Sequence, residues 1–296
     1  MFENFKANMA RKSVAKVDAK RNAGLKIPKD VDLREAIAYG SHGMNTLDVN
    51  LPKGVENPPL IVNVHGGGYF YGGTEPYRYY CASLAQMGFA VVSFNYRLAP
   101  EFKFPTPLYD LNDVMAWCLA HADEYGFDTD NIFMVGDSAG AQIASQYAVI
   151  CTNPEYSRLM GITPPEGLRF RALGLNCGMY DLPPILKDMG TEVGDVLPWY
   201  FGKDGSKLGK KADVLHYVTA DFPPSYLITS KGDFLCKCCE PMAYLLKKRG
   251  VEVKYKIYGG EKTPHVFHVN VRHPIGQEAN RDEINFFRKH LSTETE

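Results

Sequence analysis

Short apolar segments alternate with amphipathic segments along most of the chain. Six apolar segments predict strands, and several of them are rich in β-branched residues and continuous rather than strictly alternating, which is typical of strands buried on both faces. They cover residues 60–64, 89–95, 131–136, 171–176, 224–230 and 251–258. Helical patterns lie between them at about 77–87, 106–124, 138–151, 237–249 and 277–290. This alternation predicts a mostly parallel central sheet with helices on both faces.

Two other regions depart from the alternation. Segments 31–38 and 45–50 predict extra antiparallel strands at one edge of the sheet. Residues 181–222 form an insertion between two strands, and a structureless loop of that length is unusual in a compact domain. We therefore expect a small helical cap, formed by this insertion and a helix within about residues 1–30. The whole chain, 1–296, is then one α/β domain.

Composition narrows the class of protein. The apolar fraction of 45% and the formal net charge of −1 describe an ordinary globular protein and argue against a general nucleic-acid binder. The sequence holds no apolar run long enough for a membrane span. Residues 1–24 lack the apolar core of a signal peptide, which predicts a cytoplasmic protein. Their basic amphipathic pattern favours a helix packed on the domain over one lying on a membrane surface.

The seven cysteines follow no regular framework, and without a signal peptide we expect free thiols in a reducing compartment. The group Cys236, Cys238 and Cys239 lacks the second Cys or His pair of a zinc site. We therefore expect no bound metal.

A Gly-x-Ser-x-Gly element, with Gly136, Ser138 and Gly140, follows a predicted strand and precedes a predicted helix. In that position it predicts a sharp turn that lifts one serine above the sheet edge. A serine nucleophile needs a base, and the base needs an acid, in the chain order Ser, Asp or Glu, His. Asp233 follows a later strand, and His265 and His268 both follow the last one. We favour Asp233 and His265, with His268 as the alternative base.

Three consecutive glycines, residues 66–68, follow His65 at the end of an early strand. Glycines allow backbone N–H groups to approach a negatively charged oxygen, and the N–H of Ala139 would complete such a set. A dinucleotide-binding loop is excluded because Tyr71 stands where the third glycine is required.

The stretches HGGGYF (65–70), NYRLAPEFKFPTPLYD (95–110), GDSAG (136–140), GDFL (232–235) and HVF (265–267) together resemble the hormone-sensitive-lipase-type (bacterial family IV) esterases of the α/β-hydrolase fold. The resemblance implies Ser138 as nucleophile, Asp233 as acid and His265 as base. It implies that the oxyanion donors are Gly67, Gly68 and Ala139. The residues that would support them are His65, Gly66 and Asp137. Departures from the family pattern at Ala141, Phe234 and Val266 remove none of the three reacting residues.

The predicted activity is hydrolysis of carboxylic esters, with short acyl groups such as acetyl favoured and no cofactor required. Tyr69, Phe70 and Trp199 are pocket candidates, although core packing explains each of them equally well. The predicted partner is a small-molecule ester, and a homodimer is expected only from the family's tendency to self-associate. Two alternatives stay open: an amidase or formamidase with the same three residues, and a non-catalytic small-molecule receptor.

Overall fold

The computed structural model describes residues 2–182, 196–202 and 205–292. Within these residues eight strands form one sheet, in the order β1-β2-β4-β3-β5-β6-β7-β8. β2 pairs antiparallel with β1 and with β4, and all other pairs are parallel. The strands are β1 (Val31–Ala38), β2 (Thr46–Pro52), β3 (Pro59–Val64), β4 (Ala90–Phe94), β5 (Asp128–Asp137), β6 (Phe170–Asn176), β7 (Ser225–Ser230) and β8 (Val253–Tyr258).

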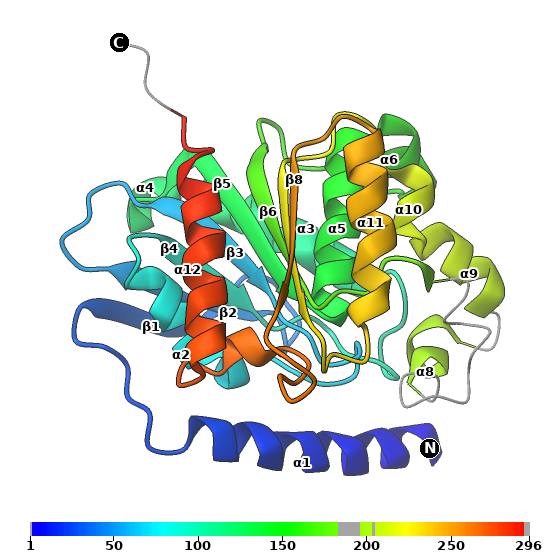
Figure 1. Ribbon diagram of the computed structural model, residues 1–296, viewed down its shortest axis with the longest axis horizontal. Helices are drawn as coiled ribbons and strands as arrows, with labels where there is room; N and C mark the ends of the chain where they lie inside the picture. The colour runs from blue at the N-terminus through cyan, green and yellow to red at the C-terminus, as the bar shows by residue number, and fades with distance from the viewer. Residues whose placement is uncertain (1, 183–195, 203–204, 293–296) are drawn as a thin grey trace.

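Helices cover both faces of the sheet (Figure 1). α2 and α12 pack on one face, around Phe133 and Ile228, and α3, α5 and α11 pack on the other, around Val62 and Leu175. The inner strands are apolar on both faces because each face meets a helical layer. The described helices are α1 (Phe2–Asn22), α2 (Thr74–Ala85), α3 (Thr106–Ala120), α4 (Ala122–Tyr125), α5 (Ala139–Thr152), α6 (Pro154–Met160), α8 (Leu197–Phe201), α9 (Gly205–Ala212), α10 (Val214–Tyr217), α11 (Cys236–Lys248) and α12 (Pro274–Arg288), with the 3₁₀ helix η1 (Phe267–Val269).

The six predicted parallel strands and the two antiparallel strands toward one edge are all present, so the predicted α/β fold is confirmed. β8 forms the opposite edge of the sheet and, unlike the inner strands, is mostly half-buried or exposed. The helix expected over 106–124 is interrupted at His121, whose backbone leaves the helical conformation while its ring stacks on Trp117. The short helix α6 was not predicted. It begins at Asn153, whose side chain accepts hydrogen bonds from two N–H groups of the first turn.

The expected cap falls only partly within the described chain. The insertion 181–222 contains α8, α9 and α10, while residues 183–195 and 203–204 lie outside the described residues. α1 runs along the end of the molecule at which the parallel strands finish (Figure 1). No helix in the described part of the chain is both long and apolar enough to cross a bilayer. The cap itself therefore stays a prediction.

Arg11 fastens α1 to the domain. Its guanidinium donates to the carbonyl oxygens of Phe70 and Ala99, each at 2.7 Å, and pairs with Glu101 at 2.7 Å. Two of these acceptors are backbone groups in loops beside the ends of β3 and β4. The planar guanidinium donates to all three at once, which a lysine ammonium is poorly shaped to do.

A second ion pair organises the loop after β4. Asp110 is fully buried and accepts hydrogen bonds from the backbone N–H of Arg97 at 2.7 Å and from its Nε at 2.8 Å. The amide of Asn45 donates to the same carboxylate at 3.3 Å. Both ion-pair residues belong to the 95–110 stretch that carried the family resemblance, so that stretch encodes a charge pair whose carboxylate is fully buried and whose guanidinium is half-buried.

We predict that Asp110→Ala lowers the free energy of unfolding by about 2 kcal/mol, because Arg97 and the Asn45 amide lose a fully buried acceptor. Urea unfolding followed by circular dichroism measures the loss. Asp32→Ala is the control: Asp32 pairs with Arg34 at the surface, at 3.2 Å, and its loss should cost no more than about 0.5 kcal/mol. Equal effects of the two variants would contradict the prediction.

Candidate active site

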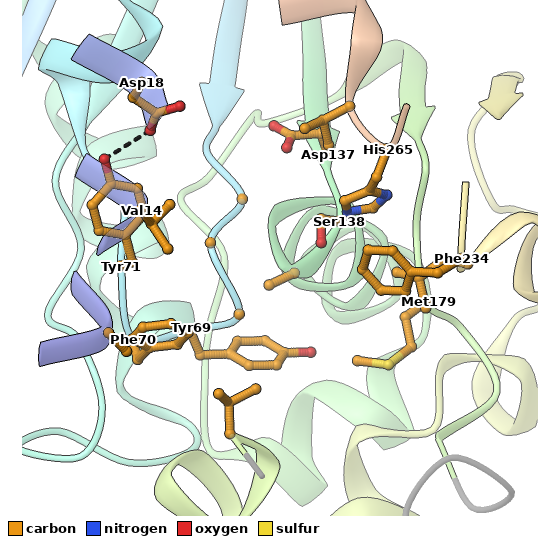
Figure 2. Close-up of a pocket in the computed structure, with 18 of the residues that line it drawn as sticks. Val14, Asp18, Tyr69, Phe70, Tyr71, Asp137, Ser138, Met179, Phe234 and His265 are labelled. Atoms are coloured by element: carbon orange, nitrogen blue, oxygen red, sulfur yellow. Dashed lines mark hydrogen bonds between the residues drawn. The ribbon is translucent and has the colours of Figure 1, made fainter. Parts of the chain in front are cut away.

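Ser138 lies in the sharp turn between β5 and α5. Its backbone has φ 52° and ψ −121°, a conformation that a residue with a side chain rarely adopts. The turn is held by a hydrogen bond from the Ser138 N–H to the carbonyl oxygen of Asn176 on β6, at 2.9 Å. The side chain projects from this turn into a pocket (Figure 2). Ser138 is half-buried, and this strand–turn–helix geometry is the one expected of a serine nucleophile.

The two glycines of the turn are required by space. A Cβ atom at Gly140 would lie 2.0 Å from the carbonyl oxygen of Val64, and one at Gly136 would lie 2.6 Å from the carbonyl oxygen of Gly140. Both contacts are with backbone atoms, which cannot swing aside. The first turn of α5 thus packs directly on the end of β3.

Asp233 and His265 form a hydrogen-bonded pair at the ends of β7 and β8. The ring Nδ1 of His265 lies 2.7 Å from Oδ1 of Asp233. The same carboxylate accepts the N–H of Leu235 at 2.8 Å and the hydroxyl of Thr229 at 2.7 Å. Burial by itself would raise the pKa of Asp233, but the His265 ring and these two donors outweigh burial and lower the pKa below its ordinary value. Asp233 is therefore a fixed carboxylate that orients the imidazole.

His268, the alternative base, lies elsewhere. Its side chain is buried in the core between α2 and α12, with its ring 5.4 Å from that of Tyr80. Burial lowers the pKa of His268 to about 3, so the ring stays neutral. It does not line the pocket that holds Ser138, whereas His265 does.

The glycine loop brings its backbone to the same pocket. Gly67 (φ 110°) and Gly68 (φ 58°) have conformations that favour glycine, and both line the pocket beside Ser138 and Ala139. The N–H of Gly66 instead donates to the hydroxyl of Tyr77 at 3.0 Å. Gly66 is therefore an anchor of the loop, while Gly67, Gly68 and Ala139 face the pocket.

Asp137 and Tyr77 hold the start of this loop. The Tyr77 hydroxyl donates to Oδ2 of Asp137 at 2.8 Å, and a Cβ atom at Gly66 would lie 2.4 Å from that oxygen. Burial raises the pKa of Asp137 to about 6, despite the hydrogen bond from Tyr77. The loop and the serine turn are thus joined through one buried carboxylate.

His65 supports the loop from below. Its ring is fully buried and stacks on Tyr96, with centroids 4.0 Å apart and planes within 8°. Its Nδ1 lies 2.7 Å from the carbonyl oxygen of Gly66, which fits a neutral ring that donates from Nδ1. Burial lowers the pKa of His65 to about 4, which keeps the ring in that neutral form.

The pocket has a volume of about 440 Å³ and mostly apolar walls. Tyr69 and Phe70 line it, as Figure 2 shows. Trp199, the third pocket candidate, does not line it but packs edge-on against Phe70, with centroids 5.3 Å apart. Further side chains contribute to the walls, and the sequence did not single out several of them, among them Val14, Asp18 and Met179. Phe234, a departure from the family pattern, lines the pocket as well.

One wall of the pocket has a polar end supplied by α1. Oδ2 of Asp18 accepts the hydroxyl of Tyr71 at 2.7 Å, and Oδ1 pairs with Arg21 at 2.6 Å. Opposite this wall, Phe234 lies with its ring 4.4 Å from that of His265 (Figure 2). Helical spacing places Asp18 and Arg21 on one face of α1, but the sequence does not reveal which surface that face covers.

Among the described residues, Cys177 groups with Asp233 and His265 at a spacing like that of metal ligands. Its sulfur and the ligand atoms of those two residues lie within 4.8 Å of one another, a spacing that suits a metal ion. The carboxylate and the imidazole nitrogen are, however, already hydrogen-bonded to each other at 2.7 Å. Burial raises the pKa of the Cys177 thiol, which disfavours the thiolate that a metal needs. The arrangement therefore fits an acid–base pair better than a metal centre.

Comparison with known proteins agrees with this geometry. The model of the α/β-hydrolase-fold family matches residues 61–269. The chain belongs to the α/β-hydrolase family, in its hormone-sensitive-lipase-like branch. It is 30% identical to the carboxylesterase NlhH of Mycobacterium tuberculosis over 78% of this chain and 75% of that protein. It is 28% identical to the versiconal hemiacetal acetate esterase of Dothistroma septosporum, over 73% and 68% of the two chains.

A solved structure gives the same picture at the level of the fold. Esterase B from Lactobacillus rhamnosis, in a complex with a C4-C4 tributyrin phosphonate inhibitor, superposes with a TM-score of 0.86. The sequence identity is 27%, and the match covers 96% of this α/β hydrolase and 94% of the esterase. This α/β hydrolase is accordingly a carboxylic ester hydrolase.

We predict that Tyr77→Phe lowers the free energy of unfolding by about 1–3 kcal/mol, because the Gly66 N–H and the Asp137 carboxylate each lose a buried partner. Urea unfolding measures this loss. Tyr79→Phe is the matched control, since no described hydrogen bond involves the Tyr79 hydroxyl; it should change stability little. A Tyr77→Phe variant as stable as the wild type would show that this hydroxyl does not anchor the loop.

Proposed function

We propose that this α/β hydrolase cleaves short-chain acyl esters, such as acetyl and butyryl esters, through an acyl-enzyme on Ser138. The observation that carries the proposal is the 2.7 Å contact between His265 and Asp233 in the pocket into which the strained Ser138 turn projects. In this proposal the nucleophile, the base and the orienting acid come from three separate strand ends; Ser138 and His265 line one cavity, and Asp233 is hydrogen-bonded to His265.

The chemistry follows from the roles of these groups. Nδ1 of His265 donates to Asp233, which leaves Nε2 to take the proton of the Ser138 hydroxyl as its oxygen attacks the ester carbonyl. The N–H groups of Gly67, Gly68 and Ala139 stabilise the resulting oxyanion. The alcohol leaves with the proton from His265, and water activated by the same imidazole then releases the acid. Each oxyanion donor contributes about 2.7–4 kcal/mol to transition-state stabilisation in comparable enzymes.

Two features support a short acyl group. Tyr69, Phe70 and Met179 line a pocket of about 440 Å³ in which an acyl chain of a few carbons is easily buried. The names of two similar proteins point the same way: one acts on an acetate ester, and the other is inhibited by a tributyrin phosphonate. We also propose that α1 and the segment 181–222 act as the cap of this pocket, since Val14 and Leu197 both line it.

The cellular location belongs to the same proposal. All seven cysteines are unpaired, which fits the reducing cytoplasm that the sequence predicts.

A chain-length series tests the proposal. The p-nitrophenyl esters from acetate to palmitate are offered to the wild type and to Ser138→Ala, with Ser145→Ala as a control for the loss of a buried serine hydroxyl on α5. We expect kcat/KM to be highest for the short esters, to vanish for Ser138→Ala and to persist for Ser145→Ala. A folded wild type that cleaves amides but not esters would favour an amidase, and one that cleaves neither would favour a receptor.

Asp233→Asn tests the acid. The amide keeps the shape of the side chain but removes the charge that holds the His265 tautomer, so kcat should fall by about 10⁴-fold. Asp181→Asn is the control, because that half-buried carboxylate makes no described contact with His265. Stopped-flow or steady-state assays with p-nitrophenyl butyrate measure the change. A loss of less than about tenfold would assign the orienting role to another group.

A further inference from the structure

A cluster of polar side chains is buried beside the Ser138 turn, on the face of the sheet that α2 and α12 cover. Each of its members is at most 1% exposed: Tyr80, Asp137, Asn176, His268 and Glu283. Each has at least one side-chain polar atom without a hydrogen-bond partner in the described chain. Unpartnered buried polar atoms cost free energy, so several in one place call for an explanation.

Glu283 of α12 is seated on β6. A Cβ atom at Gly174 would lie 2.1 Å from its Oε1, so the carboxyl rests where a strand side chain would otherwise project. The backbone at Gly174 lies outside the left-handed region, so space rather than conformation favours glycine there: a side chain would displace the Glu283 carboxyl and press on Val135, whose Cγ1 would lie 3.0 Å from the added Cβ. The side-chain amide of Asn176, two residues along the strand, lies close enough to the same carboxyl to lower its pKa, but the two groups form no hydrogen bond of good geometry.

The environment of Glu283 favours a neutral carboxyl group. It forms no ion pair with any residue that the structure describes, and neither oxygen has a well-formed hydrogen bond. Burial raises the pKa of Glu283 to about 8, and the negative charge of Asp137 acts in the same direction, while the Asn176 amide opposes it. At neutral pH the group is a carboxylic acid packed against backbone.

The strand segment under Glu283 is the one that holds the nucleophile. The carbonyl oxygen of Asn176 accepts the N–H of Ser138 at 2.9 Å, and Asn176 pairs with Asp137 in the β5–β6 register. A residue at φ 52° stays in that conformation only while its surroundings hold it there. Packing of α12 on this segment is thus one contact removed from the reacting serine.

We propose that Glu283 is a positioning residue: as a neutral acid it supports the end of β6 beneath Ser138, and on ionisation it withdraws that support. This inference rests on the proposed function, since it assumes that Ser138 is the nucleophile. A buried carboxylate must be solvated, so ionisation pulls the side chain toward water and separates α12 from Gly174 and Asn176. The Ser138 turn then loses its fixed geometry, and ester hydrolysis slows at alkaline pH.

The other titratable groups around Glu283 keep their charge state between pH 7 and 9. On α2, burial raises the pKa of Tyr80 and raises that of Cys81 to about 12. On β7, burial raises the pKa of Tyr226, which interacts electrostatically with Glu283, to about 12. On β5, Asp137, whose pKa burial raises to about 6, is already ionised. On η1, His268, with a pKa lowered to about 3 by burial, is already neutral. Glu283 is therefore the member of this cluster whose ionisation falls in that range.

The test compares the pH profiles of the wild type, Glu283→Gln and Asp282→Asn with p-nitrophenyl butyrate. With a pKa of about 8, the protonated fraction falls about tenfold from pH 7 to pH 9, and wild-type kcat should fall with it. Glutamine is neutral at every pH, so Glu283→Gln should stay active without this alkaline decline. Asp282→Asn removes the neighbouring surface charge that pairs with Lys256 and should follow the wild type.

Melting temperature gives a readout that needs no substrate. A raised pKa in the folded state means that stability is full below the unfolded pKa and is lost as pH rises through about 8. Glu283→Gln does not undergo this loss. The difference in melting temperature between Glu283→Gln and the wild type should therefore increase in favour of the variant from pH 5 to pH 8.5. Two results would overturn this inference but leave the proposed function standing: a Glu283→Gln variant that shows the same alkaline decline as the wild type, or one that is folded but inactive at pH 7. An inactive wild type, or an active Ser138→Ala, would overturn the proposed function and this inference with it.

Discussion

The close approach of α5 to the end of β3 is the constraint on which the site depends. With 2.0 Å between a Cβ atom at position 140 and the Val64 carbonyl oxygen, only glycine fits there. This contact brings the start of the helix against the strand whose continuation is the glycine loop. The chain turns sharply at Ser138, and Ala139 lines the same pocket as Gly67 and Gly68. One steric contact thus sets the proposed nucleophile and the proposed oxyanion donors relative to each other.

Three buried carboxyl groups near this turn differ in charge because their surroundings differ. Asp233 receives hydrogen bonds from His265, Thr229 and Leu235, and it stays ionised despite its burial. Asp137 receives one from Tyr77 and titrates near pH 6. Glu283 receives none of good geometry and keeps its proton to about pH 8. The number of donors facing each carboxylate, rather than burial alone, accounts for this order.

The sequence predicted the parts of the molecule that are governed by local rules. Strand hydrophobicity, the glycines around Ser138 and the strand-end positions of Asp233 and His265 follow from short-range steric and solvation requirements. The sequence did not predict residues whose role depends on which helix packs against which part of the domain. Asp18 and Val14 reach the pocket only because α1 crosses the strand ends. Trp199 does not line the pocket but packs against Phe70, which does. The sequence does not indicate that Glu283 is buried beside the Ser138 turn, because the residue it packs on, Gly174, is more than 100 positions away along the chain.

The attachment of α1 has a consequence for the order in which the molecule is completed. Arg11 bonds to groups that follow it by 59, 88 and 90 residues, so the helix has no docking surface until the first half of the sheet exists. No strand pairing depends on α1, and a segment held by a few side-chain contacts opens more readily than the core beneath it. The pocket wall that α1 supplies therefore forms after the sheet and detaches before the sheet unfolds. Under mild denaturation the enzyme should lose its substrate selectivity while the sheet is still intact.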